Sequence, residues 1–357
     1  MLKCILRQLL LPYPSMKDGK LMNKNTKNSI LFMYKLAAGI LALVGMFVIA
    51  MAFGAAKTSV KDVWLALTSN AKTDTVLMLR EIRFPREIAA IVVGAALSVS
   101  GAIMQGLTRN PLADPGLLGL SAGANAALAL TLAFIPSANY FWITIACFIG
   151  AGIGTAMVFG IGAFQKGGFS PLRIVLAGAA VSTFLYAIAE GIGLIFKLSK
   201  DVSMWTSGGM IGTTWGQLKI IIPFVVIGIL ISMFLSRQLT VLSLNEEVAV
   251  GLGQKTTQIK AILFIVIILL AGTSVALVGN MAFIGLMIPH IVRAIVGTDY
   301  RFIIPTSAVI GATFMLFADT LGRTINAPYE TPVAAIVAAL GLPFFLIIIR
   351  KGGKLFS

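Results

Sequence analysis

The chain has 357 residues, of which 58% are hydrophobic and only 11% are charged, with 28 Lys and Arg against 13 Asp and Glu. Soluble domains carry about 25% charged residues, so this composition excludes an ordinary water-soluble domain. The net charge of +15 would suit a nucleic-acid binder, but no basic stripe alternates with aromatic residues, and basic residues also collect on the cytoplasmic loops of membrane proteins.

The first 29 residues predict a cytoplasmic tail. They contain six Lys and Arg and a single acid, Asp18, and basic residues mark segments that stay inside. The apolar run Leu9–Leu11 is too short for a cleavable signal peptide, and Pro12 follows it directly. Met16 and Met22 remain alternative translation starts.

Ten apolar segments follow the tail. Each is about 20 residues long, the length that a helix needs to cross the hydrocarbon core, and none shows the alternation typical of barrel strands. Because lipid requires backbone polar groups to be bonded within the protein, we predict an all-α membrane protein, a bundle of ten transmembrane helices. In chain order the segments are Leu31–Phe53, Pro85–Leu107, Gly119–Ile135, Phe141–Phe164, Ile174–Phe196, Leu218–Ser236, Ile259–Val278, Met281–Gly297, Phe302–Ala318 and Pro332–Ile349.

The charges of the loops predict the orientation. With the N-terminus in the cytoplasm and ten crossings, the inner side carries 18 Lys and Arg and 5 acids. The outer side carries 10 Lys and Arg and 8 acids. This excess of basic residues inside is typical of membrane proteins, so we expect both termini in the cytoplasm. The chain then divides into an N-terminal tail (1–29), one membrane domain (30–351) and a C-terminal tail (352–357).

The chain lacks the motifs of a nucleotide-driven pump and of an enzyme. The nearest match to a P-loop, Gly251–Thr256, has Gln254 where that motif requires glycine, so any ATP must be bound by another subunit. His290 is the single histidine, and neither it nor Cys4 and Cys147 have the partners that a catalytic triad, a disulfide or a metal site needs. We expect no catalytic residue, no metal site and no cofactor.

A single acid, Glu190, is placed clearly within a predicted span. Ionisable side chains are unfavourable in lipid and usually face a polar cavity or a partner. Glu190 is therefore a candidate for the transport pathway, and a buried, hydrogen-bonded structural role is the alternative. One acid gives little support for proton coupling, which usually involves several such groups.

Three ordered blocks of sequence are more specific than hydropathy. The blocks are Arg83–Arg86 with Gly94–Gly101, Gln105 and Asn110–Gly119; Gly279–Arg293; and Ala318–Arg323 with Glu330–Pro332 and Gly341–Pro343. Their order and spacing, over Leu31–Lys351, resemble the FecCD-type permeases, the membrane subunits of type II ABC importers for ferric siderophores, haem and vitamin B12.

The resemblance implies partners. Permeases of this family are dimers of ten-helix subunits, so a second permease subunit, identical or homologous, is implied. Two ATP-binding cassette ATPases in the cytoplasm and an extracytoplasmic solute-binding protein are implied as well. Outer arginines of relatives pair with acids of the binding protein, and the matching residues are Arg83, Arg86 and Arg323. Anchoring of helix ends in lipid headgroups is the alternative role for these arginines.

The inner segment 237–258 resembles the family's coupling segment, which fits a cleft on the ATPase. Two leucines and a valine recur every four residues and predict an apolar stripe on a short helix. Two glycines permit a tight turn after it. An interfacial helix lying on lipid is the alternative, and Asn245 replaces the glycine that many relatives have. The coupling candidates are Leu244, Glu246, Glu247, Val248, Gly251, Leu252 and Gly253.

These observations predict the permease subunit of a binding-protein-dependent ABC importer in the bacterial cytoplasmic (inner) membrane. A ferric siderophore is the expected cargo, moved by alternating access that ATP hydrolysis on partner subunits drives. Import of cobalamin or haem is an alternative, and so is a proton-coupled secondary carrier that uses Glu190.

Overall fold

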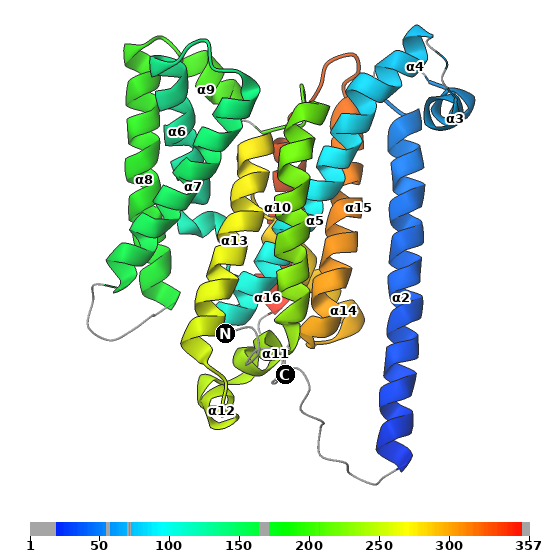
Figure 1. Ribbon diagram of the computed structural model, residues 1–357, viewed down its shortest axis with the longest axis vertical. Coiled ribbons are helices and arrows are strands. Elements are labelled where there is room, and N and C mark those ends of the chain that lie inside the picture. Colours follow the sequence, from blue (N-terminus) through cyan, green and yellow to red (C-terminus); the bar gives the residue numbers. More distant parts are fainter. Residues whose placement is uncertain are drawn as a thin grey trace.

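Every regular element is a helix in the part of the chain that the structure describes. The structure is a computed structural model that describes residues 19–54, 58–69, 71, 73–163, 171–206 and 208–351. Most of its helices run along the long axis of the molecule (Figure 1). These findings confirm the prediction of an all-α membrane fold.

Seven helices in the described ranges are long and apolar enough to cross a membrane. One of them is continuous from α4 (Asp74–Met78) through a π-helical turn, η1 (Leu79–Arg83), into α5 (Phe84–Thr108). The others are α2 (Gly19–Ala52), α7 (Tyr140–Ala163), α8 (Pro171–Ile195), α10 (Trp215–Phe234), α13 (Thr256–Val278) and α15 (Tyr300–Thr324).

Three shorter apolar helices, α6 (Leu120–Phe134), α14 (Ile284–Val296) and α16 (Val333–Lys351), occupy the remaining predicted segments. With 15 and 13 residues, α6 and α14 are about 20 Å long, less than the ~30 Å hydrocarbon core. Each predicted segment thus corresponds to an apolar helix. The number of complete crossings and the side of each terminus stay predictions.

Short helices lie at the two ends of the bundle (Figure 1). At one end, which the predicted topology places outside, are α3 (Val60–Thr68) and α9 (Ser199–Thr206). At the opposite, inner end are α11 (Ser236–Leu244) and α12 (Glu246–Gly251), together with the start of α2. The 3₁₀ helix η2 (Pro115–Leu118) precedes α6.

The N-terminal helix begins at Gly19, within the segment predicted as a tail. Residues 1–18 of that tail, including Cys4, lie outside the described residues, and so does the predicted C-terminal tail 352–357. The division into a tail and a membrane domain therefore stays a prediction.

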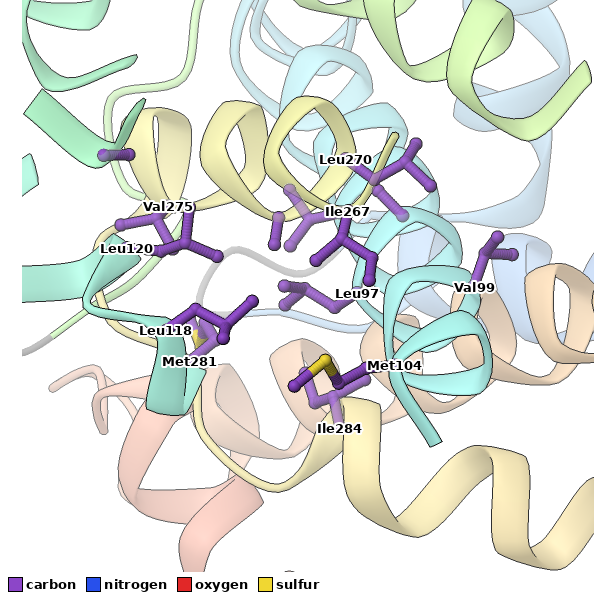
Figure 2. Packing of buried hydrophobic residues seen from close by; sticks show 14 of the residues in the cluster. Leu97, Val99, Met104, Leu118, Leu120, Ile267, Leu270, Val275, Met281 and Ile284 are labelled. Atoms are coloured by element: carbon purple, nitrogen blue, oxygen red, sulfur yellow. The ribbon is translucent and has the colours of Figure 1, made fainter. Parts of the chain in front are cut away.

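Helix α5 lies at the centre and packs against α13, α14 and α15. A Cβ added at Gly101 would lie 1.9 Å from the carbonyl oxygen of Gly285 on α14, and one added at Gly94 would lie 2.3 Å from that of Gly311 on α15. Only glycine lets these helix backbones approach so closely. Around these contacts the buried side chains include Leu97, Met104, Ile267, Leu270 and Ile284 (Figure 2).

Candidate functional site

The three arginines predicted to dock a binding protein lie together at the outer end of α5 and α15. Arg83 ends η1, Arg86 lies in the first turn of α5, and Arg323 lies in the last turn of α15. Their exposed fractions are 6, 9 and 3%. The fold therefore brings the arginines together but buries them.

Three acids pair with Arg86 and Arg323. Arg86 Nη2 lies 2.8 Å from Asp319 Oδ1, and its Nη1 lies 2.9 Å from Glu330 Oε1. Arg323 Nη2 lies 2.6 Å from Glu87 Oε1, and its Nε is in ionic contact with Asp319 Oδ2 at 3.0 Å. The outer charge cluster, as we call it, consists of Arg83, Arg86, Glu87, Asp319, Arg323 and Glu330.

Arg83 joins the outer charge cluster to the end of α2. Its Nη1 donates hydrogen bonds to the carbonyl oxygen of Met51 and to Thr58 Oγ1, both at 2.7 Å. Gly54 lies between these two acceptors in the chain, and a Cβ added there would lie 2.8 Å from Arg83 Nη2. Met51, Gly54 and Thr58 thus lie close to this guanidinium group.

The outer charge cluster is electrically balanced, with three guanidinium groups and three carboxylates. Charged groups withdrawn from water persist only when they are paired, so Arg86 and Arg323 offer no unpaired charge to a partner. A carboxylate from a docking protein would have to displace an internal acid. Glu330 is the accessible one, because its side chain is 28% exposed while those of Glu87 and Asp319 are fully buried. Docking by Arg83, Arg86 and Arg323 stays a prediction.

The expectation that Glu190 alone lies clearly within a span is wrong. Glu87 and Asp319 are fully buried in helices that also qualify as spans. The predicted segments begin at Pro85 and end at Ala318, which places both acids at segment ends. In the structure α5 is preceded by helix without a break, and α15 continues to Thr324.

Glu190 itself lies on the exposed face of α8 that also carries Thr183 and Ala187. Spacings of three and four residues place the three side chains on one side of the helix. The exposure leaves the carboxylate accessible to a pathway or to a second subunit. Its role as a pathway residue stays a prediction.

A cavity of about 410 Å³ opens between α6, α7, α9, α10 and α13. Its lining is apolar except for a few polar groups, and no sequence motif indicates it, because its walls come from five separate helices. The polar or amphipathic lining residues are Tyr140, Asp201, Trp205, Thr213 and Gln217.

The predicted coupling stripe is exposed at the inner end, but it runs over the end of α11 and α12 and not over the single short helix that the spacing predicted. Helices α11 and α12 meet at Asn245, whose side chain accepts a hydrogen bond from the Glu247 amide at 2.9 Å. Leu244, Val248 and Leu252 are 72, 48 and 68% exposed. An exposed apolar patch of this kind marks a contact with a protein or with the membrane surface.

The other face of the coupling segment packs on the helix bundle, where Leu239, Leu242 and Ala249 are buried. Of the two predicted turn glycines, Gly253 adopts φ +78°, a conformation that favours glycine, between α12 and α13. Gly251 is the last residue of α12. One face of the coupling segment is thus buried against the helix bundle, and the opposite face is exposed.

The described part of the chain contains no group of three or more His, Cys, Asp or Glu side chains arranged to hold a metal ion. Cys147 is buried, and the ring of His290 packs edge-on against Phe344 with 5.7 Å between the centroids. Neither residue belongs to the outer charge cluster or to the coupling segment.

Comparisons with known proteins cover nearly the whole chain. The model of the FecCD transport family matches residues 41–351. The iron(3+)-hydroxamate import system permease protein FhuB of Bacillus subtilis (strain 168) is 42% identical over 318 residues, which is 88% of this chain and 83% of that protein. The Fe(3+)-citrate import system permease protein YfmD of the same organism is 40% identical over 279 residues, 78% of this chain and 83% of that protein. A solved inward-facing structure, assigned to the metal-chelate type of ABC transporter, has a TM-score of 0.79 at 26% identity and covers 89% of this chain and 99% of that one.

Proposed function

Because the chain belongs to the FecCD transport family, we propose that it is the membrane permease of a binding-protein-dependent ABC importer for ferric siderophores. The two relatives are named for import of iron(3+)-hydroxamate and of Fe(3+)-citrate. Both compounds are ferric chelates, which supports a cargo of this class.

The exposed stripe of Leu244, Val248 and Leu252 is the structural observation that best supports this proposal. A permease without a P-loop of its own depends on a separate ATPase and needs an inner surface that receives it. The stripe is apolar, lies on short helices and is opposite the face that packs on the bundle. A short helix that presents one apolar face is a common way to fill a groove on a partner protein.

The proposed assembly contains two permease subunits, two ATP-binding cassette ATPases in the cytoplasm and a solute-binding protein outside a bacterial cytoplasmic membrane. The apolar side chains that α8 and α16 expose meet lipid or the second permease subunit, which is identical or homologous. They include Phe184, Leu194, Leu342 and Leu346.

In this assembly the chain performs no covalent chemistry and holds no cofactor. ATP binding and hydrolysis on the partner subunits move the coupling segment, and the helices attached to it change the side to which the pathway opens. The energy for this change comes from ATP binding and hydrolysis, because each nucleotide state of the ATPases binds one conformation of the permease more tightly than the other.

Uptake by a deletion strain tests the proposal. Cells that lack this chain but keep the ATPase and the binding protein are expected to lose uptake of a ferric hydroxamate siderophore, and the wild-type chain is expected to restore it. Uptake that does not change on deletion would overturn the proposed function. Loss of haem or cobalamin uptake with intact siderophore uptake would replace the cargo and keep the transporter class.

A further inference from the structure

Glu246 of the coupling helix α12 faces the helix bundle and not the exposed stripe. Its Oε1 lies 2.5 Å from Lys260 Nζ, and its Oε2 lies 3.9 Å from Arg109 Nη2. The two carboxylate oxygens therefore form ion pairs with two different side chains. Glu247, the next residue, is exposed, and its carboxylate makes no ion pair with another described residue.

The two cations mark the inner ends of the two central helices. Lys260 lies near the start of α13, and Arg109 is the residue that ends α5. Arg109 has φ +51°, a left-handed conformation that is uncommon for a residue other than glycine. Helices α5 and α13 pack against each other, so a displacement of α12 that is transmitted through Glu246 reaches both at once.

The same two helices lead from Glu246 to the outer features of the molecule. The outer end of α5 carries Arg86 and Glu87 of the outer charge cluster. The outer end of α13 contributes Leu277 and Val278 to the wall of the 410 Å³ cavity. Figure 1 shows α13 (yellow) running from α12 at the inner end towards α9 at the outer end.

We propose that Glu246 is a positioning residue that fixes α12 to the inner ends of α5 and α13 and thereby passes the movement of the ATPase to them. This inference rests on the proposed function. Half-exposed ion pairs contribute little to folding stability, so the effect of Glu246 lies in the coupling between ATP hydrolysis and transport.

The test uses the full assembly in proteoliposomes and compares Glu246→Gln with Glu81→Gln, the same substitution at an exposed glutamate of η1 far from the coupling segment. Two quantities are measured: the amount of ATPase that stays bound and the number of ferric siderophore molecules imported per ATP hydrolysed. For Glu246→Gln we expect normal ATPase binding and a ratio lowered by about five-fold, the change that loss of one half-exposed ion pair allows. For Glu81→Gln we expect both quantities to be unchanged.

A second variant, Lys260→Gln, removes the ion pair between Glu246 and Lys260 by changing the partner on α13. We expect it to lower the ratio less than Glu246→Gln does, because the contact between Glu246 and Arg109 remains. We expect the double variant to be no worse than Glu246→Gln alone, because residues that act through one contact are not additive. Additive losses would overturn the proposal.

The remaining outcomes separate the inference from the proposed function. An assembly in which the wild-type chain imports nothing overturns both. Normal import by the wild type with an unchanged ratio in Glu246→Gln, or with equal losses in Glu246→Gln and Glu81→Gln, overturns the inference alone. Loss of the ATPase from the Glu246→Gln assembly also overturns it, since Glu246 would then contact the ATPase directly.

Discussion

Replacing Asp319 by asparagine removes a carboxylate that contacts two buried arginines. Asp319 is fully buried, it accepts hydrogen bonds from Arg86 at 2.8 and 3.1 Å, and it contacts Arg323 at 3.0 Å. The variant leaves three guanidinium groups facing two carboxylates. Asparagine keeps one acceptor oxygen and nearly the same shape, so the change isolates the charge.

The expected loss of stability follows from burial. Removing one partner of a buried ion pair costs about 3–5 kcal/mol, because the other charge is left uncompensated. We place Asp319→Asn near ~3 kcal/mol, since its amide oxygen still accepts a hydrogen bond. The control is Glu330→Gln, which weakens the partly exposed pair with Arg86 and is expected to cost about 1 kcal/mol or less.

The assay is the free energy of unfolding in mixed detergent micelles, followed by circular dichroism during titration with a denaturing detergent. A further variant checks the mechanism. Adding Arg86→Met to Asp319→Asn restores the balance of charges, so the double variant is expected to lose about 1–3 kcal/mol less than the sum of the single losses. A loss for Asp319→Asn no larger than that for Glu330→Gln, or simple additivity in the double variant, would refute the reasoning.

Three other predictions concern docking, packing and coupling. Glu330→Gln frees one side of Arg86 and is expected to strengthen binding of the solute-binding protein at low salt; unchanged binding would remove the docking role of Arg86. Gly101→Ala places a methyl group against the Gly285 carbonyl and is expected to destabilise the fold by about 3 kcal/mol, while Gly152→Ala, with open space around its Cβ position, is neutral or slightly stabilising in the same unfolding assay. The pair Leu244→Glu and Leu252→Glu is expected to abolish co-purification of the ATPase, and Leu67→Glu, an exposed leucine of α3, is expected to leave it intact.

Hydropathy and local spacing were sufficient to predict where the helices lie in the sequence and that the coupling segment has an apolar stripe. A span needs only about 20 consecutive apolar residues, which a single segment of sequence supplies. The four-residue spacing of Leu244, Val248 and Leu252 predicted one apolar face, which the structure divides between the end of α11 and α12. Both features depend on neighbours in sequence.

The outer charge cluster depends instead on tertiary structure. Arg86 and Asp319 are separated by 233 residues, and nothing in either segment shows that α5 and α15 pack against each other. A signal was present, however. Glu87 and Asp319 each lie close to an arginine within or beside an apolar segment, where an unpaired acid would be unfavourable. The ion pairs of Glu246 with Lys260 and Arg109 could not be predicted from the sequence for the same reason, because they join three separate helices.

The most direct test of the central claim is uptake by proteoliposomes that contain this chain, its ATPase and its binding protein. We expect accumulation of a ferric siderophore labelled with radioactive iron only when ATP is enclosed with the ATPase, and none when the chain alone is given a proton gradient. Uptake by the chain alone in response to the gradient would contradict the account and would identify a secondary carrier.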